Sequence, residues 1–161
     1  MKSSMAVVTG ATSGIGKSLT SKLASQGLTV FAIGRNKGRL DQLQDLECHK
    51  NIIPWQCDIT REEDLSVAVA QLHQLSEKHE LKYLVHNATA LNPISPLTEV
   101  SFAEMEDQMR VNVTGPMTLT NHLNTLMKPD SRIFFISTGA SRAAVPHLVP
   151  HCAAKAAQAT L

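Results

Sequence analysis

The sequence predicts an α/β fold, in which helices connect the strands of a parallel sheet. Two observations indicate this class: short apolar runs alternate with helical patterns along the whole chain, and a glycine-rich turn follows the first apolar run. The chain has 161 residues, of which 43% are hydrophobic, enough for one domain with a genuine core. Because aromatic residues make up only 4%, that core should be mostly aliphatic.

Five apolar runs are predicted to be strands. In chain order they are Met5–Thr9, Thr29–Ile33, Ile52–Cys57, Tyr83–His86 and Arg132–Ser137.

Helices are predicted after each of the first two strands and at the end of the chain. The first helix begins near Ile15 and ends at Gly27, a residue type common just past a helix end, and the second covers roughly residues 36–47. The final stretch is alanine-rich and holds His151 and Lys155, which lie four residues apart and therefore share a helix face.

Two further helices are predicted from capping boxes, in which a Ser or Thr pairs with a Glu three residues later. The pairs are Thr60 with Glu63 and Ser101 with Glu104. Pro116 should bend the second of these helices near Asn112. The loop 88–98 follows the fourth strand at its C-terminal end, where doubly wound sheets bind their ligands.

Basic residues are concentrated at the start of the chain. Residues 1–40 contain six Lys or Arg and no acidic residue, although the formal net charge of the whole chain is only +1. A basic first quarter on a nearly neutral chain favours a small anionic ligand over a nucleic acid. Lys17 and Lys22 fit the solvated face of a helix, an explanation that suits the cluster of Arg35, Lys37 and Arg39 less well.

The cysteines and the length of the apolar runs indicate the cellular setting. Cys48, Cys57 and Cys152 have no metal-like spacing and are interpreted as free thiols in a reducing compartment. No signal peptide and no run of membrane-spanning length is evident, so we expect a cytoplasmic protein with no membrane partner. His147, His151 and Cys152 lie close together, but Pro150 interrupts them and no further ligand is apparent, so no metal site is predicted.

The turn after the first strand reads TGATSGIG and contains Gly10, Gly14 and Gly16. Glycines between a strand and a helix permit a tight turn, close approach of the backbone to a pyrophosphate, and close packing of the helix on the strand. The N-terminus of the following helix adds free N–H groups and a positive dipole. The sequence therefore predicts a phosphate-binding turn, although its GxxxGxG spacing differs from the common GxGxxG.

This turn resembles the TGxxxGIG cofactor turn of the short-chain dehydrogenase/reductase family, which residues 9–16 match at every fixed position. The resemblance extends from residue 5 to the end of the chain. It implies a Rossmann-type doubly wound parallel sheet with a dinucleotide at the turn, where the cofactor-binding residues would be Gly10, Thr12, Ser13, Gly14, Ile15 and Gly16.

Two more motifs resemble the family's cofactor site. Cys57-Asp58-Ile59 falls where family members hold the adenine with an aspartate and the next backbone N–H, which assigns this role to Asp58 and Ile59. His86-Asn87-Ala88-Thr89 falls where the family usually has Asn-Asn-Ala-Gly beside the cofactor, which adds Asn87 and Ala88. Thr89 in place of the usual glycine is expected to crowd the nicotinamide.

The resemblance also implies four catalytic positions. Asn112 would anchor a water chain to Lys155, and Lys155 would bind the nicotinamide ribose. Thr138 stands where the family carries its serine and would orient the substrate oxygen, with Ser137 as the neighbouring alternative. His151 stands at the family's catalytic tyrosine, the proton donor or acceptor, and the chain's one tyrosine, Tyr83, is expected far from the site.

Charge predicts which nicotinamide cofactor binds. An NAD site needs a carboxylate about 20 residues beyond the glycines, but that place reads Ile33-Gly34-Arg35-Asn36. A carboxylate would repel a 2′-phosphate, whereas Arg35 can pair with it through a bidentate fork. We therefore expect NADP(H) to be preferred over NAD(H).

Histidine changes the acid–base chemistry expected at position 151. A tyrosine of pKa ~10 is made more acidic by a nearby lysine cation, but a histidine of pKa ~6.5 is made a weaker proton donor by the same charge. His151 should therefore be mostly neutral at pH 7, a fair base and a poor acid.

These features predict an NADP(H)-dependent oxidoreductase that interconverts a small-molecule carbonyl and an alcohol by hydride transfer. The alternative is a nucleotide-binding protein of the same fold with little or no catalysis, acting as a sensor or partner. Family chains continue through a substrate segment and two more strands, so the resemblance implies that residues 1–161 form one dinucleotide-binding domain lacking its C-terminal strands. We expect the last strand to be a bare apolar edge and the full-length protein to be a homo-oligomer; the sequence does not identify the substrate.

Overall fold

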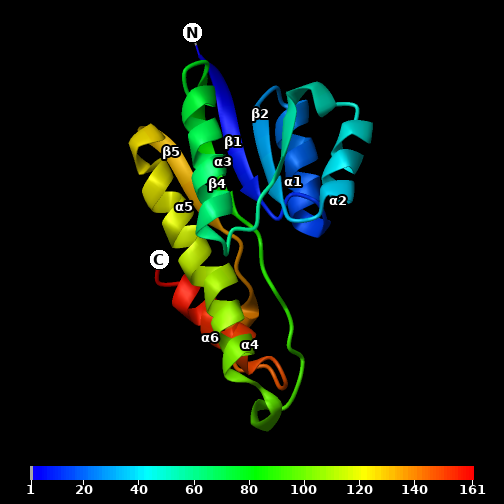
Figure 1. Cartoon of the computed structure of the whole chain (residues 1–161), viewed down its shortest axis with the longest axis vertical. Coiled ribbons are helices and arrows are strands. Elements are labelled where there is room, and N and C mark those ends of the chain that lie inside the picture. The colour runs from blue at the N-terminus through cyan, green and yellow to red at the C-terminus, as the bar shows by residue number, and fades with distance from the viewer. Residues whose placement is uncertain (1) are drawn as a thin grey trace.

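A computed structural model describes residues 2–161 and contains one five-stranded parallel sheet with helices on both faces (Figure 1). The strands lie in the order β3-β2-β1-β4-β5. Their bounds are Ser3–Thr9 (β1), Thr29–Gly34 (β2), Ile52–Gln56 (β3), His79–His86 (β4) and Met127–Phe135 (β5). The strand order reverses between β1 and β4, and doubly wound sheets bind ligands in the crevice beyond the carboxyl ends of such strands. The predicted α/β, Rossmann-type class is confirmed.

Within residues 2–161, six α-helices connect these strands or follow them. They are α1 (Gly14–Ser25), α2 (Lys37–Asp41), α3 (Glu62–Leu75), α4 (Phe102–Met109), α5 (Gly115–Leu123) and α6 (Val149–Gln158). Short 3-10 segments lie at Gln42–Asp45 (η1), His49–Asn51 (η2), Leu97–Glu99 (η3), Asn124–Leu126 (η5) and Gly139–Ser141 (η6), and a π-helical turn, η4, spans Arg110–Thr114. None of the helices in residues 2–161 is long and apolar enough to cross a membrane.

The core lies on both faces of the sheet. Met5, Val7, Phe31 and Ile33 pack with side chains of α3 and α5, including Leu65, Leu72, Leu119 and Leu123. The alternate residues of the same strands, Val8, Val30 and Ala32, pack with Ala24 of α1, Leu40 of α2 and Leu43 of η1. Burial on both faces explains why the central strands read as continuous apolar runs rather than as alternating ones.

Two strands begin well before their predicted first residues, and β1 and β2 also extend slightly, to Ser3 and Gly34. β4 begins at His79 rather than Tyr83, and β5 spans Met127–Phe135 rather than 132–137. The added residues are mostly polar, and an ion pair between Lys82 and Asp130 joins the two strands, while Glu80 of β4 also pairs with Lys82. At the other side of the sheet, β3 ends at Gln56, one residue short of Cys57, and the second helix ends as an α-helix at Asp41 before η1 continues it.

β5 is the edge strand beside β4, and it exposes apolar surface. Ile133 is 38% exposed and Phe134 is 47% exposed. This agrees with the expected apolar edge, a kind of surface that promotes pairing with other chains.

One of the two predicted capping boxes is confirmed. Ser101 and Glu104 cap α4 reciprocally. The box at Thr60 is wrong, because α3 begins at Glu62 with Arg61 as its N-cap. The hydroxyl and the N–H of Thr60 both donate instead to Asp58 Oδ1, at 2.7 and 3.0 Å, since this acceptor lies only two residues away.

The irregularity predicted near Asn112 takes the form of the π-helical turn η4, which separates α4 from α5. Pro116 has no N–H, so it cannot donate to the carbonyl of Asn112 four residues earlier. That carbonyl is therefore left without its usual partner in the helix, which matters for the site below.

Candidate functional site

A pocket of about 610 Å³ opens at the carboxyl ends of the strands, across the point where the strand order reverses. It is lined by 13 of the 15 predicted site residues: Gly10, Thr12, Ser13, Gly14, Ile15, Arg35, Asp58, Ile59, Asn87, Ala88, Thr138, His151 and Lys155. Gly16 and Asn112 do not line it. The pocket also includes residues outside the predicted set, namely Ile33, Gly34, Asn36, Arg39, Cys57, Thr89, Leu91, Val111, Ile136 and Ser137.

The glycine turn is packed directly against the end of β4. Gly10 has φ +65°, and a Cβ there would lie 2.8 Å from Ala88 Cα. A Cβ on Gly16 would overlap the carbonyl oxygen of Gly10 and the side-chain amide of Asn87. Position 10 therefore needs glycine both for its positive φ and because the backbone of Ala88 lies so close. Gly16 lets α1 pack closely on the glycine turn and Asn87, beneath the pocket.

Thr9 and Asn87 join the ends of β1 and β4. The Thr9 hydroxyl oxygen accepts from the backbone N–H groups of Asn87 (3.1 Å) and Ala88 (3.0 Å). Asn87 Nδ2 donates to the carbonyls of Thr9 and Gly10, both at 3.1 Å. These bonds fix the two strand ends that frame the crevice.

The N-terminus of α1 faces the pocket with its donors free of side-chain caps. Ser13 is the N-cap in an extended conformation, its side chain makes no capping hydrogen bond, and the first turn carries no acidic residue. Ser13, Gly14 and Ile15 all line the pocket. Free N–H groups together with the positive end of the helix dipole suit an anion.

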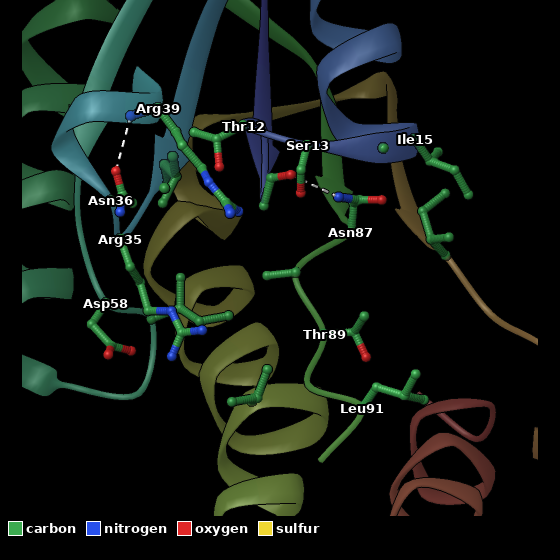
Figure 2. Close-up of a pocket in the computed structure, with 18 of the residues that line it drawn as sticks. Thr12, Ser13, Ile15, Arg35, Asn36, Arg39, Asp58, Asn87, Thr89 and Leu91 are labelled. Carbon is green, nitrogen blue, oxygen red and sulfur yellow. Dashed lines mark hydrogen bonds between the residues drawn. The ribbon is translucent and has the colours of Figure 1, made fainter. Parts of the chain in front are cut away.

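Arg35, directly after β2, and Arg39 of α2 reach into the same opening across from Thr89 and Leu91, as Figure 2 shows. Asn36 caps α2 by accepting from the Arg39 N–H at 2.9 Å. Lys37, the third cation of the cluster, pairs with Asp41 at 3.0 Å. Within residues 2–161 no carboxylate lies within ion-pair distance of Arg35 or Arg39, so both guanidinium groups are available to a ligand.

Asp58 and Cys57 line the same side of the pocket. The Asp58 carboxylate is oriented by the two bonds from Thr60, and its N–H donates to Asp64 at 2.8 Å. Burial, with the charges of Asp64 and Asp58 adding to it, raises the pKa of the Cys57 thiol to about 12. The thiol is therefore neutral and unreactive at ordinary pH.

His151 is 6% exposed and lines the pocket from the first turn of α6. Its Nδ1 lies 3.0 Å from the carbonyl oxygen of Ala90. Because a carbonyl can only accept, Nδ1 carries the hydrogen and neutral His151 has its lone pair on Nε2. Within the described residues, Nε2 makes no hydrogen bond and is not fully buried. A ligand in the pocket can therefore reach it.

The pKa of His151 is lowered, as the sequence predicted. Burial is the main cause, the hydrogen bond to Ala90 opposes it, and the Lys155 charge adds a smaller lowering effect. The expected direction is confirmed, but the main cause is loss of water rather than the lysine.

Lys155 is 3% exposed, and burial lowers its pKa to about 8. Its Nζ donates to the carbonyl of Ile136 and to Gln158 Oε1, both at 2.9 Å. Gln158 Nε2 in turn donates to the carbonyl of Asn112 at 2.8 Å. Gln158 thus bridges Lys155 and the carbonyl of Asn112, the two residues between which the sequence predicted a water chain.

The side chain of Asn112 holds the loop after β4. Its Oδ1 accepts from the Thr89 hydroxyl at 2.8 Å, and its Nδ2 donates to Gln108 Oε1 at 3.2 Å. Gln108 Nε2 donates to the carbonyl of Asn92 in the same loop. Thr89 therefore replaces the family's glycine with a hydroxyl that ties the loop to η4.

Thr138 lies at the start of η6, beyond the end of β5, and is exposed in the pocket with Ser137. Its hydroxyl oxygen accepts from the Ala140 N–H at 3.4 Å. The hydroxyl hydrogen remains free to donate to an oxygen in the pocket.

His86 is buried at the end of β4. Its Nε2 lies 2.8 Å from the Thr120 hydroxyl and its ring stacks on Phe135 with centroids 4.8 Å apart. Nδ1 has no hydrogen-bond partner, and burial lowers the pKa of His86 to about 4. It is therefore a neutral packing residue.

Comparison with known proteins identifies the family. Residues 4–161 match the profile described as short chain dehydrogenase. The chain is 31% identical over 143 residues to an uncharacterised short-chain type dehydrogenase/reductase of Sinorhizobium fredii, covering 89% of this chain and 54% of that protein. It is 29% identical over 153 residues to the NADPH-dependent pterin aldehyde reductase of Arabidopsis thaliana, covering 92% and 62%.

A solved structure also resembles this chain. The closed form of serine dehydrogenase complexed with NADP+ superposes with a TM-score of 0.85 at 27% identity, over 94% of this chain and 61% of that one. The chain thus spans between about half and two thirds of the length of these proteins. The profile match covers nearly every residue, and the chain belongs to the short-chain dehydrogenase family.

Proposed function

We propose that this protein binds NADP(H) and interconverts a small-molecule carbonyl and an alcohol by hydride transfer. One observation carries the proposal: a single pocket holds two unpaired arginines and a glycine turn at one end, with His151, Lys155 and Thr138 at the other. The first group suits a phosphorylated nucleotide, and the second supplies the proton and hydrogen-bond donors that carbonyl chemistry needs.

The residues at the nucleotide end fit the cofactor. Gly10 and the uncapped start of α1 would receive the pyrophosphate, and Arg35 with Arg39 would hold the 2′-phosphate. Asp58 and the N–H of Ile59 would contact the adenine, and Asn87 and Ala88 would border the nicotinamide. The NADPH dependence of the Arabidopsis reductase and the NADP+ bound in the serine dehydrogenase complex support this choice.

The residues at the other end would handle the substrate oxygen. When bound, the cofactor supplies or accepts the hydride. Thr138 donates a hydrogen bond to the oxygen, with Ser137 as its neighbour, and His151 Nε2 takes or gives the proton. Lys155 holds the ribose through the one N–H that its two protein bonds leave free.

The state of His151 sets the favoured direction. Its lowered pKa keeps it neutral at pH 7, with the lone pair on Nε2. A neutral imidazole accepts the proton of an alcohol, so oxidation is favoured near neutrality. Carbonyl reduction needs the protonated form and should become faster as the pH falls.

Calorimetric titration with NADPH and NADH tests the proposal. NADPH should bind more tightly, and Arg35→Ala should erase most of that preference, on the order of 10- to 100-fold, because charged hydrogen bonds contribute about 1.5–3 kcal/mol. Lys37→Ala is the matched control, since Lys37 already pairs with Asp41. Equal affinities of the unmodified protein for the two cofactors would contradict the proposal.

A second function, nucleotide binding without catalysis, is favoured by one observation. Tyr83, the chain's one tyrosine, lies in β4 against Phe134 and not in the pocket, so no tyrosine can act there as the proton donor. The protein would then bind the nucleotide without turning over substrate. Tight NADPH binding with no turnover across a broad panel of carbonyls and alcohols would favour this function over the first.

A further inference from the structure

Gln158 joins two elements of the site from the end of α6. Its side chain is 2% exposed and makes two hydrogen bonds, accepting from Lys155 Nζ and donating to the Asn112 carbonyl. The amide can be oriented in only one way, because an ammonium needs the oxygen and a carbonyl needs the nitrogen. Both contacts therefore depend on the same fixed rotamer.

The Asn112 carbonyl is available to Gln158 because of the local sequence. In a regular helix it would accept from the N–H four residues later, but residue 116 is proline. Asn112 is fully buried, which closes its carbonyl off from bulk water. Gln158 supplies that donor across 46 residues of sequence.

Lys155 is fixed by the same amide. Of its three N–H donors, one goes to the carbonyl of Ile136 and one to Gln158. Both acceptors are neutral, so the lysine charge is held by dipoles and not by a carboxylate.

We infer that Gln158 is a positioning residue that bridges the free Asn112 carbonyl and Lys155, and thereby fixes the ammonium group with one N–H left for the pocket. Its part in the reaction rests on the proposed function. The coupling of Gln158 to the charge of Lys155 does not depend on the proposed function.

Few other charges bear on Lys155. α6 packs against α4, η4 and η6. His151 and Cys152 are the other titratable side chains of α6; the charged residues of the packed elements are Glu104, Glu106 and Asp107 of α4 and Arg110 of η4. None of these side chains bonds to Lys155, and burial is the cause that lowers its pKa. Substitutions at 158 should therefore change the pKa of Lys155 directly.

The test is the pKa of Lys155, followed by 13C NMR of the lysine Cε in the whole chain without cofactor, with Lys155→Arg to assign the signal. Gln158→Leu removes the acceptor and should lower the pKa of Lys155. Gln158→Glu keeps an acceptor, adds a negative charge and should raise it by about one unit or more. Gln108→Leu is the matched control: this buried amide bonds to Asn112 but not to Lys155, and should leave that pKa unchanged.

The inference is supported if the pKa of Lys155 is highest with Glu at position 158, intermediate with Gln and lowest with Leu, and is unchanged in Gln108→Leu. The inference is overturned if the pKa of Lys155 is the same in all three proteins, or if Gln108→Leu shifts it as much as Gln158→Leu does. Gln158→Glu decides the matter if Gln158→Leu does not fold. NADPH titration of the same proteins is read separately: weaker binding in Gln158→Leu alone extends the inference to the cofactor. If the unmodified protein does not bind NADPH, the proposed function fails, and the pKa series still decides the role of Gln158.

Discussion

The two ends of the pocket differ in how their polar groups are satisfied. At the nucleotide end, Arg35 and Arg39 have no carboxylate partner in the described chain and the start of α1 has no side-chain cap. At the other end, His151 and Lys155 are already bonded to Ala90, Ile136 and Gln158. One end is arranged to receive a charge, while the other is assembled before any ligand arrives. Binding and turnover should therefore respond to different substitutions.

The largest expected effect is at the assembled end. His151→Tyr restores a donor that Lys155 can make more acidic, so carbonyl reduction with NADPH at pH 7 should become faster, by up to the 10²–10⁴-fold that general acid–base catalysis contributes. NADPH affinity should change little, which sharpens the contrast between the two ends. Rates measured from pH 5 to 9 with a carbonyl panel test this.

His147→Asn serves as the control, because His147 lies outside the pocket. The unmodified protein should reduce carbonyls faster as the pH falls toward 5–6. If His151→Ala leaves both the rate and the pH profile unchanged, His151 has no proton-transfer role.

A smaller effect is expected where the two ends meet. Thr9→Val keeps the shape but removes the acceptor of two backbone N–H groups, those of Asn87 and Ala88. An unpaired donor of this kind costs roughly 1–3 kcal/mol of folding free energy. Urea unfolding should show the loss, and Thr9→Ser, which keeps the hydroxyl, should recover most of it. An unchanged midpoint in Thr9→Val would mean that the strand ends do not depend on this junction.

An effect of the same size is expected for packing beneath the end of the pocket proposed to take the nucleotide. Gly16→Ala places a Cβ against Gly10 and Asn87, and overpacking costs roughly 1–3 kcal/mol. Gly38→Ala is the opposite control: its Cβ would meet only Asn36 Oδ1 at 3.5 Å, so it should stabilise α2 by about 0.4–1 kcal/mol. Thermal melts distinguish the two. Equal melting temperatures in both variants would remove the packing role from Gly16.

The sequence predicted features whose causes lie within a few residues of one another. The glycine turn, the capping box of Ser101 and the place of Arg35 in the pocket are of this kind. Local signals fail when two compete: Asp58 takes the donors of Thr60, so the predicted cap does not form.

Long-range contacts could not be predicted from a single sequence. The bond from His151 to Ala90 spans 61 residues and the bond from Gln158 to Asn112 spans 46. Pro116 signals that a carbonyl will be free, but nothing local says which side chain will reach it. Gln158 is one turn from Lys155, and that spacing was the available hint. Arg39 could have been found from its place in the basic cluster.

The buried imidazole of His86 sets an acid limit for the fold. The unfolded chain binds a proton at this residue below pH ~6.5, whereas the folded chain resists it until about pH 4. Between those values the free energy of unfolding falls as the pH falls, by roughly 3 kcal/mol in total. The pKa of His151 is also lowered, so the protonation that the proposed carbonyl reduction needs and the weakening of the fold both follow a fall in pH below ~6.5. The pH optimum for carbonyl reduction should lie where these two opposing titrations balance. Replacing His86 with a side chain that does not titrate should move that optimum to lower pH.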